Sequence, residues 1–169
     1  MLPDLLKRNL SLVICGTGAG RRSAEIGHYY AGRGNRFWQT LAEVQLTPRL
    51  LAPADYEHLL SSSIGLTDLV KDQAGRNTQI RFGRRDALQL RAKIMIYQPR
   101  YLCFNGKRAA EEFLRSGRVE FGVQSERIGR TVLFVAPSTS RAANGSWDLT
   151  VWCDLARRVL RRSAPDARG

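Results

Sequence analysis

Cysteine is scarce in this chain, with three residues in 169, and no two cysteines form a C-x-x-C pair. Cys15, Cys103 and Cys153 lie far apart, each in an apolar segment. Zinc and iron–sulfur centres need several ligands at short, regular spacing. The sequence therefore predicts no metal site, and we expect all three cysteines to be buried, reduced thiols that pack as small apolar side chains.

Long apolar runs are also missing. No stretch approaches the roughly 20 apolar residues that a membrane-spanning helix requires, and none has the pattern of a secretory signal peptide. The sequence predicts a cytoplasmic protein that makes no use of a membrane.

Negative charge is in short supply. Asp and Glu number 15 against 27 Lys and Arg, which gives a formal net charge of +12 and an isoelectric point near 10.6. A small, arginine-rich domain favours a polyanionic partner, with nucleic acid as the first candidate. The alternative is a surface that positive charge merely keeps soluble. The length suffices for one domain with a real core. We expect a single domain over 1–169, with its core at about 10–162, a short basic N-terminal lead-in and a frayed C-terminal tail.

Short apolar runs rich in branched side chains predict strands buried on both faces. Helical spacing of apolar residues predicts helices between them. The expected strands cover 10–15, 101–104 and 131–135, and the expected helices cover 35–45, 54–61, 84–97, 107–117 and a final helix capped by Ser146. The intervening segments are a polar loop after Gly20 that contains Tyr29 and Tyr30, an apolar stretch at 64–70, a surface loop at 71–81, a hairpin-like excursion at 118–130 and a frayed tail from Ser163. This alternation predicts an α/β class with a mainly parallel sheet and helices on both faces.

Each predicted strand ends in a loop of small residues, and in a parallel sheet such loops lie at one edge, where they can meet one ligand. The three loops are Gly16-Thr17-Gly18-Ala19-Gly20, Asn105-Gly106-Lys107 and Pro137-Ser138-Thr139-Ser140-Arg141. The first matches neither the dinucleotide fingerprint, because its third glycine is one residue early, nor a P-loop. The third offers hydroxyls and backbone donors that suit phosphates, although it could simply cap a turn.

Taken together and in order, these motifs resemble those of the uracil-DNA glycosylase superfamily, nearest the mismatch-specific uracil/thymine-DNA glycosylase branch. The resemblance covers about 13–160. It rests on Cys15-Gly16 with Gly20, Asn35-Arg36-Phe37-Trp38, Gly65-Leu66-Thr67-Asp68-Leu69-Val70, Asn105-Gly106-Lys107 and Pro137-Ser138-Thr139-Ser140. It implies a three-layer α/β/α fold with a short, mainly parallel central sheet.

The first motif departs from that branch. The branch has Gly-Ile-Asn-Pro-Gly there, and its Asn positions the attacking water, whereas this chain has Gly18 followed by Ala19. The stretch from Gly27 to Trp38 instead resembles the hypoxanthine-DNA glycosylase branch, whose catalytic Asn precedes the Phe-Trp pair. The resemblance thus assigns the water to Asn35. Ala136 also replaces an Asn that contacts the base in the mismatch-specific branch, which suggests relaxed discrimination among bases.

The resemblance implies hydrolysis of the N-glycosidic bond of uracil in DNA after the nucleotide has left the base stack. No cofactor is implied, and we expect a monomer that acts on DNA containing uracil or another deaminated base. The implied roles are water positioning by Asn35, with Glu25 as the fallback; base binding by Gly16, Thr17, Gly18 and Tyr30; and DNA contact by Lys107, Ser138, Thr139, Ser140 and Arg141.

Simpler interpretations stay open at this point. Asn35 could be only a helix cap, since Asn is among the best N-cap residues, and Tyr30 could only pack on the core. The substrates could extend to thymine mispairs, hypoxanthine or xanthine. Two other functions compete: a damaged-DNA-binding module that lost its chemistry with the side chain at position 18, and a nucleotide-binding α/β enzyme that uses the glycine loop.

Overall fold

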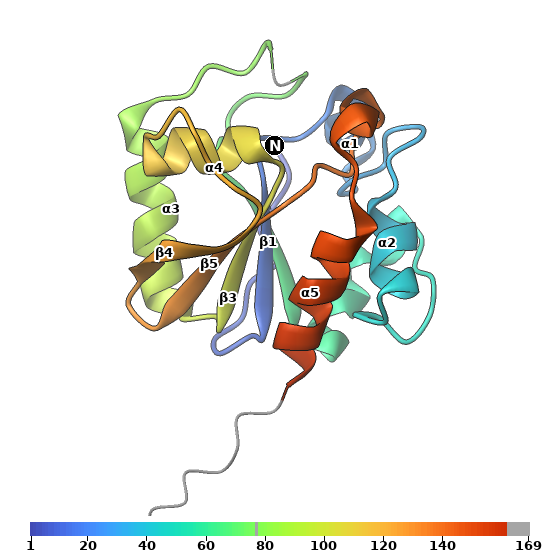
Figure 1. Cartoon of the computed structure of the whole chain (residues 1–169). Coiled ribbons are helices and arrows are strands. Elements are labelled where there is room, and N and C mark those ends of the chain that lie inside the picture. The colour runs from blue at the N-terminus through green and yellow to red at the C-terminus, as the bar shows by residue number, and fades with distance from the viewer. Residues whose placement is uncertain (77, 162–169) are drawn as a thin grey trace, which may run out of the picture.

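A computed structural model of the chain describes residues 1–76 and 78–161. A five-stranded sheet forms the middle of three layers, with α3 and α4 against one face and α2 and α5 against the other (Figure 1). The elements are β1 (Leu12–Gly16), α1 (Arg21–Ile26), α2 (Phe37–Glu43), the 3-10 helix η1 (Pro53–Ser62), β2 (Ile64–Asp68), α3 (Arg84–Tyr97), β3 (Tyr101–Asn105), α4 (Lys107–Leu114), β4 (Gly122–Ile128), β5 (Thr131–Ala136), the 3-10 helix η2 (Arg141–Ser146) and α5 (Leu149–Leu160).

The sheet has the strand order β2-β1-β3-β5-β4. The first four strands in that order are parallel, and β4 pairs antiparallel with β5. The carboxyl ends of the four parallel strands consequently lie at one edge, together with the loops that follow them. The α/β class and the three-layer, mainly parallel architecture expected from the sequence are confirmed.

The alternation of side chains along β1 explains why the sheet is covered on both faces. Leu12 and Ile14 belong to the core beneath α2 and α5, whereas Val13 and Cys15 belong to the core beneath α3 and α4. All five residues of β1 are buried. A central parallel strand has no solvent-facing side, which is why its sequence reads as a continuous apolar run. In the described part of the chain, no helix is long and apolar enough to span a membrane.

The first residues of the chain, expected to be a short basic lead-in, pack against the sheet. Leu2 and Leu5 are buried, and Leu5 forms an antiparallel bridge to Leu66 through backbone bonds of 2.9 and 2.8 Å. This bridge covers the outer edge of β2, which would otherwise expose unpaired backbone groups. The side chain of Asp4 is thereby held beside the sheet.

Sequence periodicity missed β2, α1 and the 3-10 helix η2. Residues 64–68 form β2 rather than an undefined apolar stretch, and 21–26 form the short helix α1 within what was expected to be a polar loop. The segment 122–128 of the expected hairpin-like excursion pairs with β5. Residues 53–62 form a 3-10 helix with a kink at Asp55. The tail from Ser163 lies outside the described residues.

The predicted helix boundaries also need correction. The helix expected over 35–45 is α2, which runs from Phe37 to Glu43. Ser146 does not cap the final helix, because it ends η2. Asp148 is the N-cap instead, and its Oδ1 accepts the amide hydrogen of Thr150 at 2.9 Å. A carboxylate at this position is a good N-cap and suits the positive end of the helix dipole.

The close approach at Gly65 yields a test of the fold. A Cβ at this position would lie 2.5 Å from the backbone oxygen of Leu5 and 2.7 Å from Cδ1 of Leu10. Gly65→Ala should therefore lower the unfolding free energy by about 1–3 kcal/mol, the usual cost of overpacking. Urea denaturation measures this change. Gly117→Ala is the control, because a Cβ there meets nothing within 4 Å, and equal stability of the two variants would contradict the bridge.

Candidate active site at the carboxyl edge of the sheet

The register of the sheet brings the ends of β1 and β2 side by side. Gly16 pairs with Asp68, and on the other side of β1 Cys15 pairs with Phe104, one residue before Asn105. Asn105 in turn pairs with Ala136 at the end of β5. The glycine loop, the Asn-Gly-Lys loop and the Pro-Ser-Thr-Ser-Arg loop therefore leave the sheet from one edge, as the sequence predicted.

Hydrogen bonds join the second and third loops. The Asn105 side chain donates from Nδ2 to Thr139 Oγ1 at 2.9 Å, and its Oδ1 accepts the Thr139 amide hydrogen at 3.0 Å. Both residues are buried. Gly106 has a φ of +109°, and a Cβ added to it would lie only 3.1 Å from the Cβ of Ser138. Thr139 is thus a buried structural anchor of its loop rather than a group open to DNA.

Asn35 lies at the start of α2 and caps it. Its Oδ1 accepts the Phe37 amide hydrogen at 3.0 Å, although Arg36 is the residue in the formal N-cap position. The Arg36 amide donates to the Thr139 carbonyl oxygen at 3.0 Å, which ties this turn to the third loop. An amide oxygen has two lone pairs, so capping leaves one acceptor position on Asn35.

Tyr30 lies over the end of β1 in an unusual backbone conformation. Its φ is +52°, a region that non-glycine residues seldom adopt. Its ring stacks on Phe37 with 3.9 Å between centroids. Its hydroxyl is buried and makes no hydrogen bond of normal geometry with any described group. Burial raises the pKa of this hydroxyl well above its ordinary value, and the Asp68 charge adds to the rise, while the nearby Asn105 amide opposes it.

Gly18 stands where the resembled branch has its water-positioning Asn, and this structure leaves no room for a side chain there. A Cβ on Gly18 would lie 2.9 Å from Cδ1 of Ile80 and 3.1 Å from the backbone oxygen of Val70. The segment after β2 is held in this place by the Gly75 amide, which donates to the Ala19 carbonyl at 2.9 Å. Ile80 and the Val70 carbonyl therefore occupy the space that a side chain at position 18 would need.

Asp68 is a candidate site residue that sequence reasoning missed. It ends β2, is only 5 % exposed, and is the one charged residue among the buried side chains of the described chain. A Cβ on Gly16 would lie 2.8 Å from Asp68 Oδ1 and 3.1 Å from the Tyr30 hydroxyl, so both groups face the same point. Oδ1 accepts no hydrogen bond from the described residues, whereas Oδ2 lies 3.5 Å from Lys71 Nζ. A lone carboxylate inside the apolar stretch 64–70 was the signal that could have identified it.

Burial raises the pKa of Asp68 to about 6, and the neighbouring Lys71 charge opposes the rise. A group with this pKa can exchange protons near neutral pH, which is the property of a general base. The raised pKa and the unused acceptor atom at the carboxyl edge together make Asp68 a candidate functional residue.

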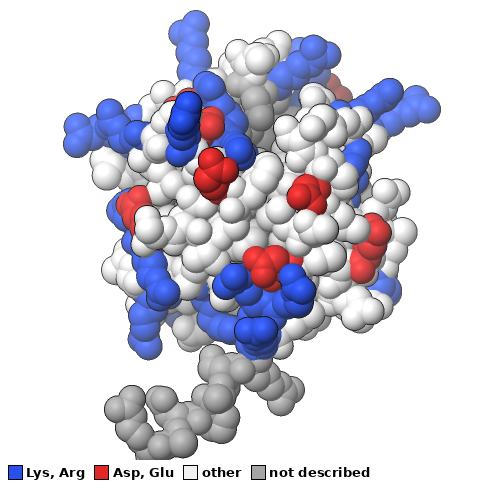
Figure 2. All heavy atoms as spheres, viewed as in Figure 1, with Lys and Arg blue, Asp and Glu red and all other residues white. Residues whose placement is uncertain are grey.

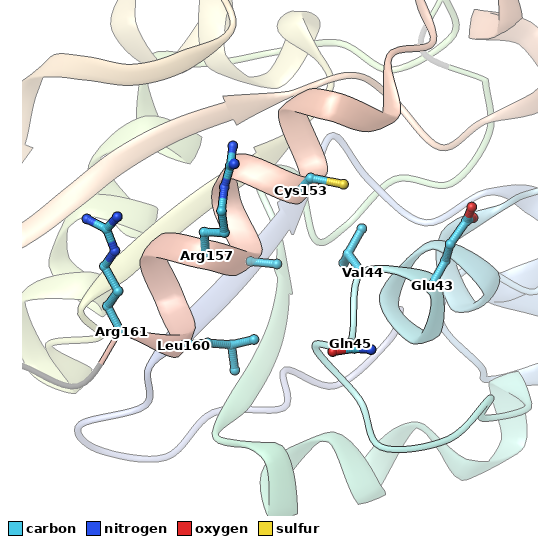
Figure 3. A pocket seen from close by; sticks show the side chains of 8 residues that line it. Glu43, Val44, Gln45, Cys153, Arg157, Leu160 and Arg161 are labelled. Carbon is cyan, nitrogen blue, oxygen red and sulfur yellow. The ribbon is translucent and has the colours of Figure 1, made fainter.

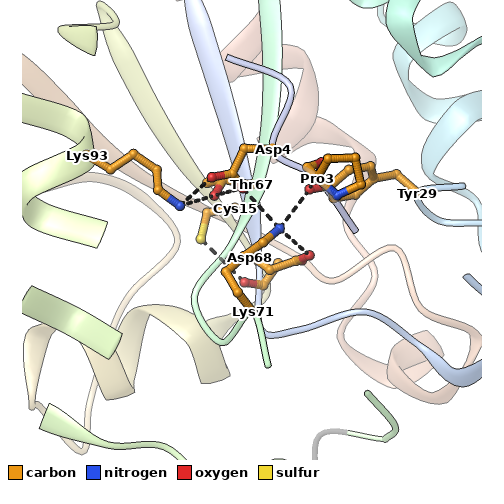
Figure 4. A network of polar contacts seen from close by, with 9 residues as sticks. Pro3, Asp4, Cys15, Tyr29, Thr67, Asp68, Lys71 and Lys93 are labelled. Carbon is orange, nitrogen blue, oxygen red and sulfur yellow. Dashed lines mark hydrogen bonds and ion pairs between the residues drawn. The ribbon is translucent and has the colours of Figure 1, made fainter. Parts of the chain in front are cut away.

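A network of charges lies behind Asp68 (Figure 4). Lys71 Nζ is 3.0 Å from Asp4 Oδ1 and donates to the Tyr29 hydroxyl at 3.1 Å. The other oxygen of Asp4 pairs with Lys93 from α3, and the Thr67 hydroxyl donates to Asp4 at 2.7 Å. Burial alone would raise the pKa of Asp4, but its bonds to Lys93 and the charge of Lys71 outweigh this and lower it.

The other predicted residues surround this centre. Lys107 begins α4, with its ammonium 4.5 Å from the centroid of the Phe121 ring. Arg141 is exposed at the start of η2, and its Cδ lies 2.9 Å from where a Cβ on Gly34 would stand. Ser140 caps η2 by accepting the Ala142 amide hydrogen. Glu25 is exposed on α1. Figure 2 shows Lys and Arg gathered at the upper edge, over the ends of the strands, and again around the end of α5.

The hollow in Figure 3 lies elsewhere, between the end of α2 and the second half of α5. Its lining includes Glu43, Val44, Cys153 and Arg157, and none of the predicted site residues. Cys153 is half-buried there, unlike the fully buried Cys15 and Cys103. Within the described residues, no group of three or more His, Cys, Asp or Glu side chains is placed to hold a metal ion.

The fold and the site define an α/β/α domain whose functional groups lie at the carboxyl edge of a mostly parallel sheet, where such domains bind their ligands. The family model of the uracil DNA glycosylase superfamily matches residues 3–156, which is most of the chain. The protein belongs to this superfamily, as its motifs indicated. Membership implies a repair function of the DNA glycosylase type, with DNA as the partner.

The packing around Gly18 gives a direct test of the site. Gly18→Asn restores the residue type of the resembled branch, but its Cβ would meet Ile80 and the Val70 carbonyl. We expect the unfolding free energy to fall by about 1–3 kcal/mol and base excision not to rise. Gly20→Asn is the control, because a Cβ there has nothing within 4 Å. A stable Gly18→Asn variant with faster excision would show that the segment around Ile80 moves aside.

Proposed function

We propose that the protein is a monofunctional uracil-DNA glycosylase, which hydrolyses the N-glycosidic bond of uracil in DNA and leaves an abasic site. Superfamily membership supports the reaction class. The observation that carries the finer proposal is the convergence of the Asp68 carboxylate and Tyr30 over Gly16. A glycosylase must hold the flipped base and the attacking water close together. An aromatic ring such as that of Tyr30 can stack on the base, and a carboxylate such as that of Asp68 can accept a proton from the water.

In this proposal, the flipped uracil stacks on the face of Tyr30 opposite Phe37, a contact worth roughly 1–3 kcal/mol. Backbone amides of the glycine loop bind the base carbonyls and stabilise the negative charge that develops as the base departs. A water oxygen bonds to the sugar carbon while the bond from that carbon to the base nitrogen breaks. Asp68 Oδ1 accepts the proton that the water loses, and the departing base takes up a proton afterwards.

Asn35 has a different role from Asp68 in this proposed mechanism. An amide is a poor base, so Asn35 would orient the water through the lone pair that its capping bond to Phe37 leaves free. Glu25 is the weaker alternative for the carboxylate role, since its side chain is exposed, whereas Asp68 is buried beside Gly16 and Tyr30.

DNA containing uracil is the proposed partner, bound by a monomer. Arg141 would enter the space left by the flipped nucleotide, with Ser138 and Ser140 beside it on the backbone, and Lys107 would contact a phosphate. The net charge of +12 supports such binding, and phosphate contacts of this kind make the affinity depend strongly on salt. Ala136 stands where the mismatch-specific branch has an Asn that contacts the base, which supports hypoxanthine, xanthine or mispaired thymine as further substrates.

The test is single-turnover excision from labelled uracil-containing oligonucleotides, both single- and double-stranded. Asp68→Asn should slow excision by about 10²- to 10⁴-fold, the usual contribution of a general base, while duplex binding is retained. Asn35→Ala should slow it less, because the carboxylate remains. Glu25→Gln, which removes one charge from an exposed position, serves as the control and should match the wild type.

The remaining outcomes separate the competing functions. Loss of excision in Glu25→Gln with full activity in Asp68→Asn would reverse the two carboxylate roles. If the wild type releases no base yet binds uracil-containing duplex more tightly than undamaged duplex, the protein is a damage-binding module. Binding of mononucleotides without preference for DNA would instead favour a nucleotide-binding enzyme.

The pKa of Asp68 predicts the pH dependence of excision. The active form of a base is the ionised one, and a carboxyl with a pKa of about 6 is ionised above that pH and protonated below it. The excision rate should therefore fall by about tenfold per unit of pH below this pKa. Excision rates of the wild type, measured between about pH 5 and pH 8, test this predicted fall. The residual activity of Asp68→Asn should lack the acid limb, and an acid limb in that variant would assign the titration to another group.

A further inference from the structure

The N-terminal segment reaches the site through a chain of ionic contacts. Leu5 is fixed to Leu66 by two backbone bonds, and this places the carboxylate of Asp4 between two lysines. Its Oδ1 lies 3.0 Å from Lys71 Nζ, and its Oδ2 pairs with Lys93. Asp4 is about three-quarters buried, with 23 % of its side chain exposed. Segments from three parts of the sequence therefore meet at one carboxylate.

Lys71 stands between two acids, and its contact with Asp4 is the shorter of the two. The ammonium is 3.0 Å from Asp4 but 3.5 Å from Asp68 Oδ2. Figure 4 shows the Lys71 side chain extending between these groups, with the Tyr29 hydroxyl as its third partner. An ammonium has three hydrogens to donate, so one cation serves both carboxylates and Tyr29. Asp68 consequently has only a share of its counter-ion.

We propose that Asp4 is a positioning residue of the active site, which holds Lys71 away from full pairing with Asp68 and so keeps Asp68 basic. The inference rests on the proposed role of Asp68 as the general base. Asp4 disfavours the ionised form of Asp68 in two ways. Its negative charge disfavours a second negative charge on Asp68, and its bond to Lys71 weakens the attraction that would stabilise that charge.

Further groups also face Asp68 and contribute to its electrostatic surroundings. Lys93 is a second cation nearby, and its pairing with Asp4 limits its effect on Asp68. The thiol of Cys15 and the hydroxyls of Tyr29 and Tyr30 are neutral at physiological pH, since burial raises the pKa of each. Lys71 and Asp4 are therefore the two charges whose removal should move the titration of Asp68 most clearly.

The experiment follows the Asp68 side-chain carboxyl carbon by ¹³C NMR as the pH is varied, with the signal assigned by its loss in Asp68→Asn. In Asp4→Asn the titration midpoint should fall, because a nearby anion is removed and Lys71 is released to Asp68. In Lys71→Gln it should rise by about one unit or more, since a close opposite charge is lost. Lys93→Gln should also raise it, which provides a second variant that leaves the N-terminal segment unchanged.

Asp72→Asn is the matched control. Asp72 follows Lys71 directly, is exposed, and makes no ion pair within the described residues. This variant changes the net charge by the same amount as Asp4→Asn and should leave the midpoint in place. An unchanged or raised midpoint in Asp4→Asn, or an equal fall in Asp72→Asn, would overturn the proposal. So would a midpoint in Lys93→Gln that fails to rise.

Excision rates separate this inference from the proposed function. If Asp68 is the base, the acid limb of the excision profile should move to lower pH in Asp4→Asn together with the NMR midpoint. If the NMR midpoint moves while the wild type excises no uracil, Asp4 still sets the charge of Asp68, and the glycosylase proposal alone fails. A purely structural role of Asp4 would lower stability without moving either pH profile.

Discussion

The pairing of β1 between β2 and β3 is the constraint on which the site depends. The three strands are parallel. Gly16 at the end of β1 therefore pairs with Asp68 of β2, and Cys15 pairs with Phe104 of β3, the residue before Asn105. Three loops that are far apart in the sequence therefore emerge from one edge. The two faces of β1 are both buried, so a slip of one residue would exchange the two cores as well as misplace the site. Core packing and active-site geometry are thus held by the same register.

The burial of Asp68 at this edge lowers the stability of the folded protein when the carboxylate is ionised. Raising a carboxyl pKa from 3.8 to about 6 corresponds to a cost on the order of 3 kcal/mol in the ionised folded state. A folded-state pKa above the unfolded value means that stability is greatest below the unfolded pKa and is lost as pH rises through 6. At neutral pH the protein therefore carries a destabilising charge at the edge of its sheet. Such a cost is typical of functional residues, whose environments oppose stability.

The fold class could be read from the sequence because β1, β3 and β5 are continuous apolar runs and buried parallel strands leave that pattern. β2 was missed because Gly65 interrupts its apolar run, and the glycine is there for the close approach of Leu5, which no local pattern reveals. The convergence of the loops at one edge could be predicted from the sequence, because they follow recognisable strands and carry distinctive residues such as Asn105 and the segment after Pro137. The sequence marks Asp68 only as one residue of a motif, because its burial and its orientation toward Gly16 are properties of the assembled sheet. The same holds for Asp4, which the sequence shows only as one residue of a short basic lead-in.

In the candidate site, the packing around Gly18 and the position of Asp68 depend on the same segment of the chain. The space beside Gly18 is filled by Ile80 and the backbone after β2, and that same segment begins directly after Asp68 and contains Lys71. A chain path that closes over Gly18 therefore also determines where the carboxylate and its counter-ion lie. In this arrangement the polar group at the edge of the sheet comes from β2 instead of the glycine loop. A carboxylate can take a proton from water where an amide can only orient it, so the exchange alters the chemistry available as well as its position.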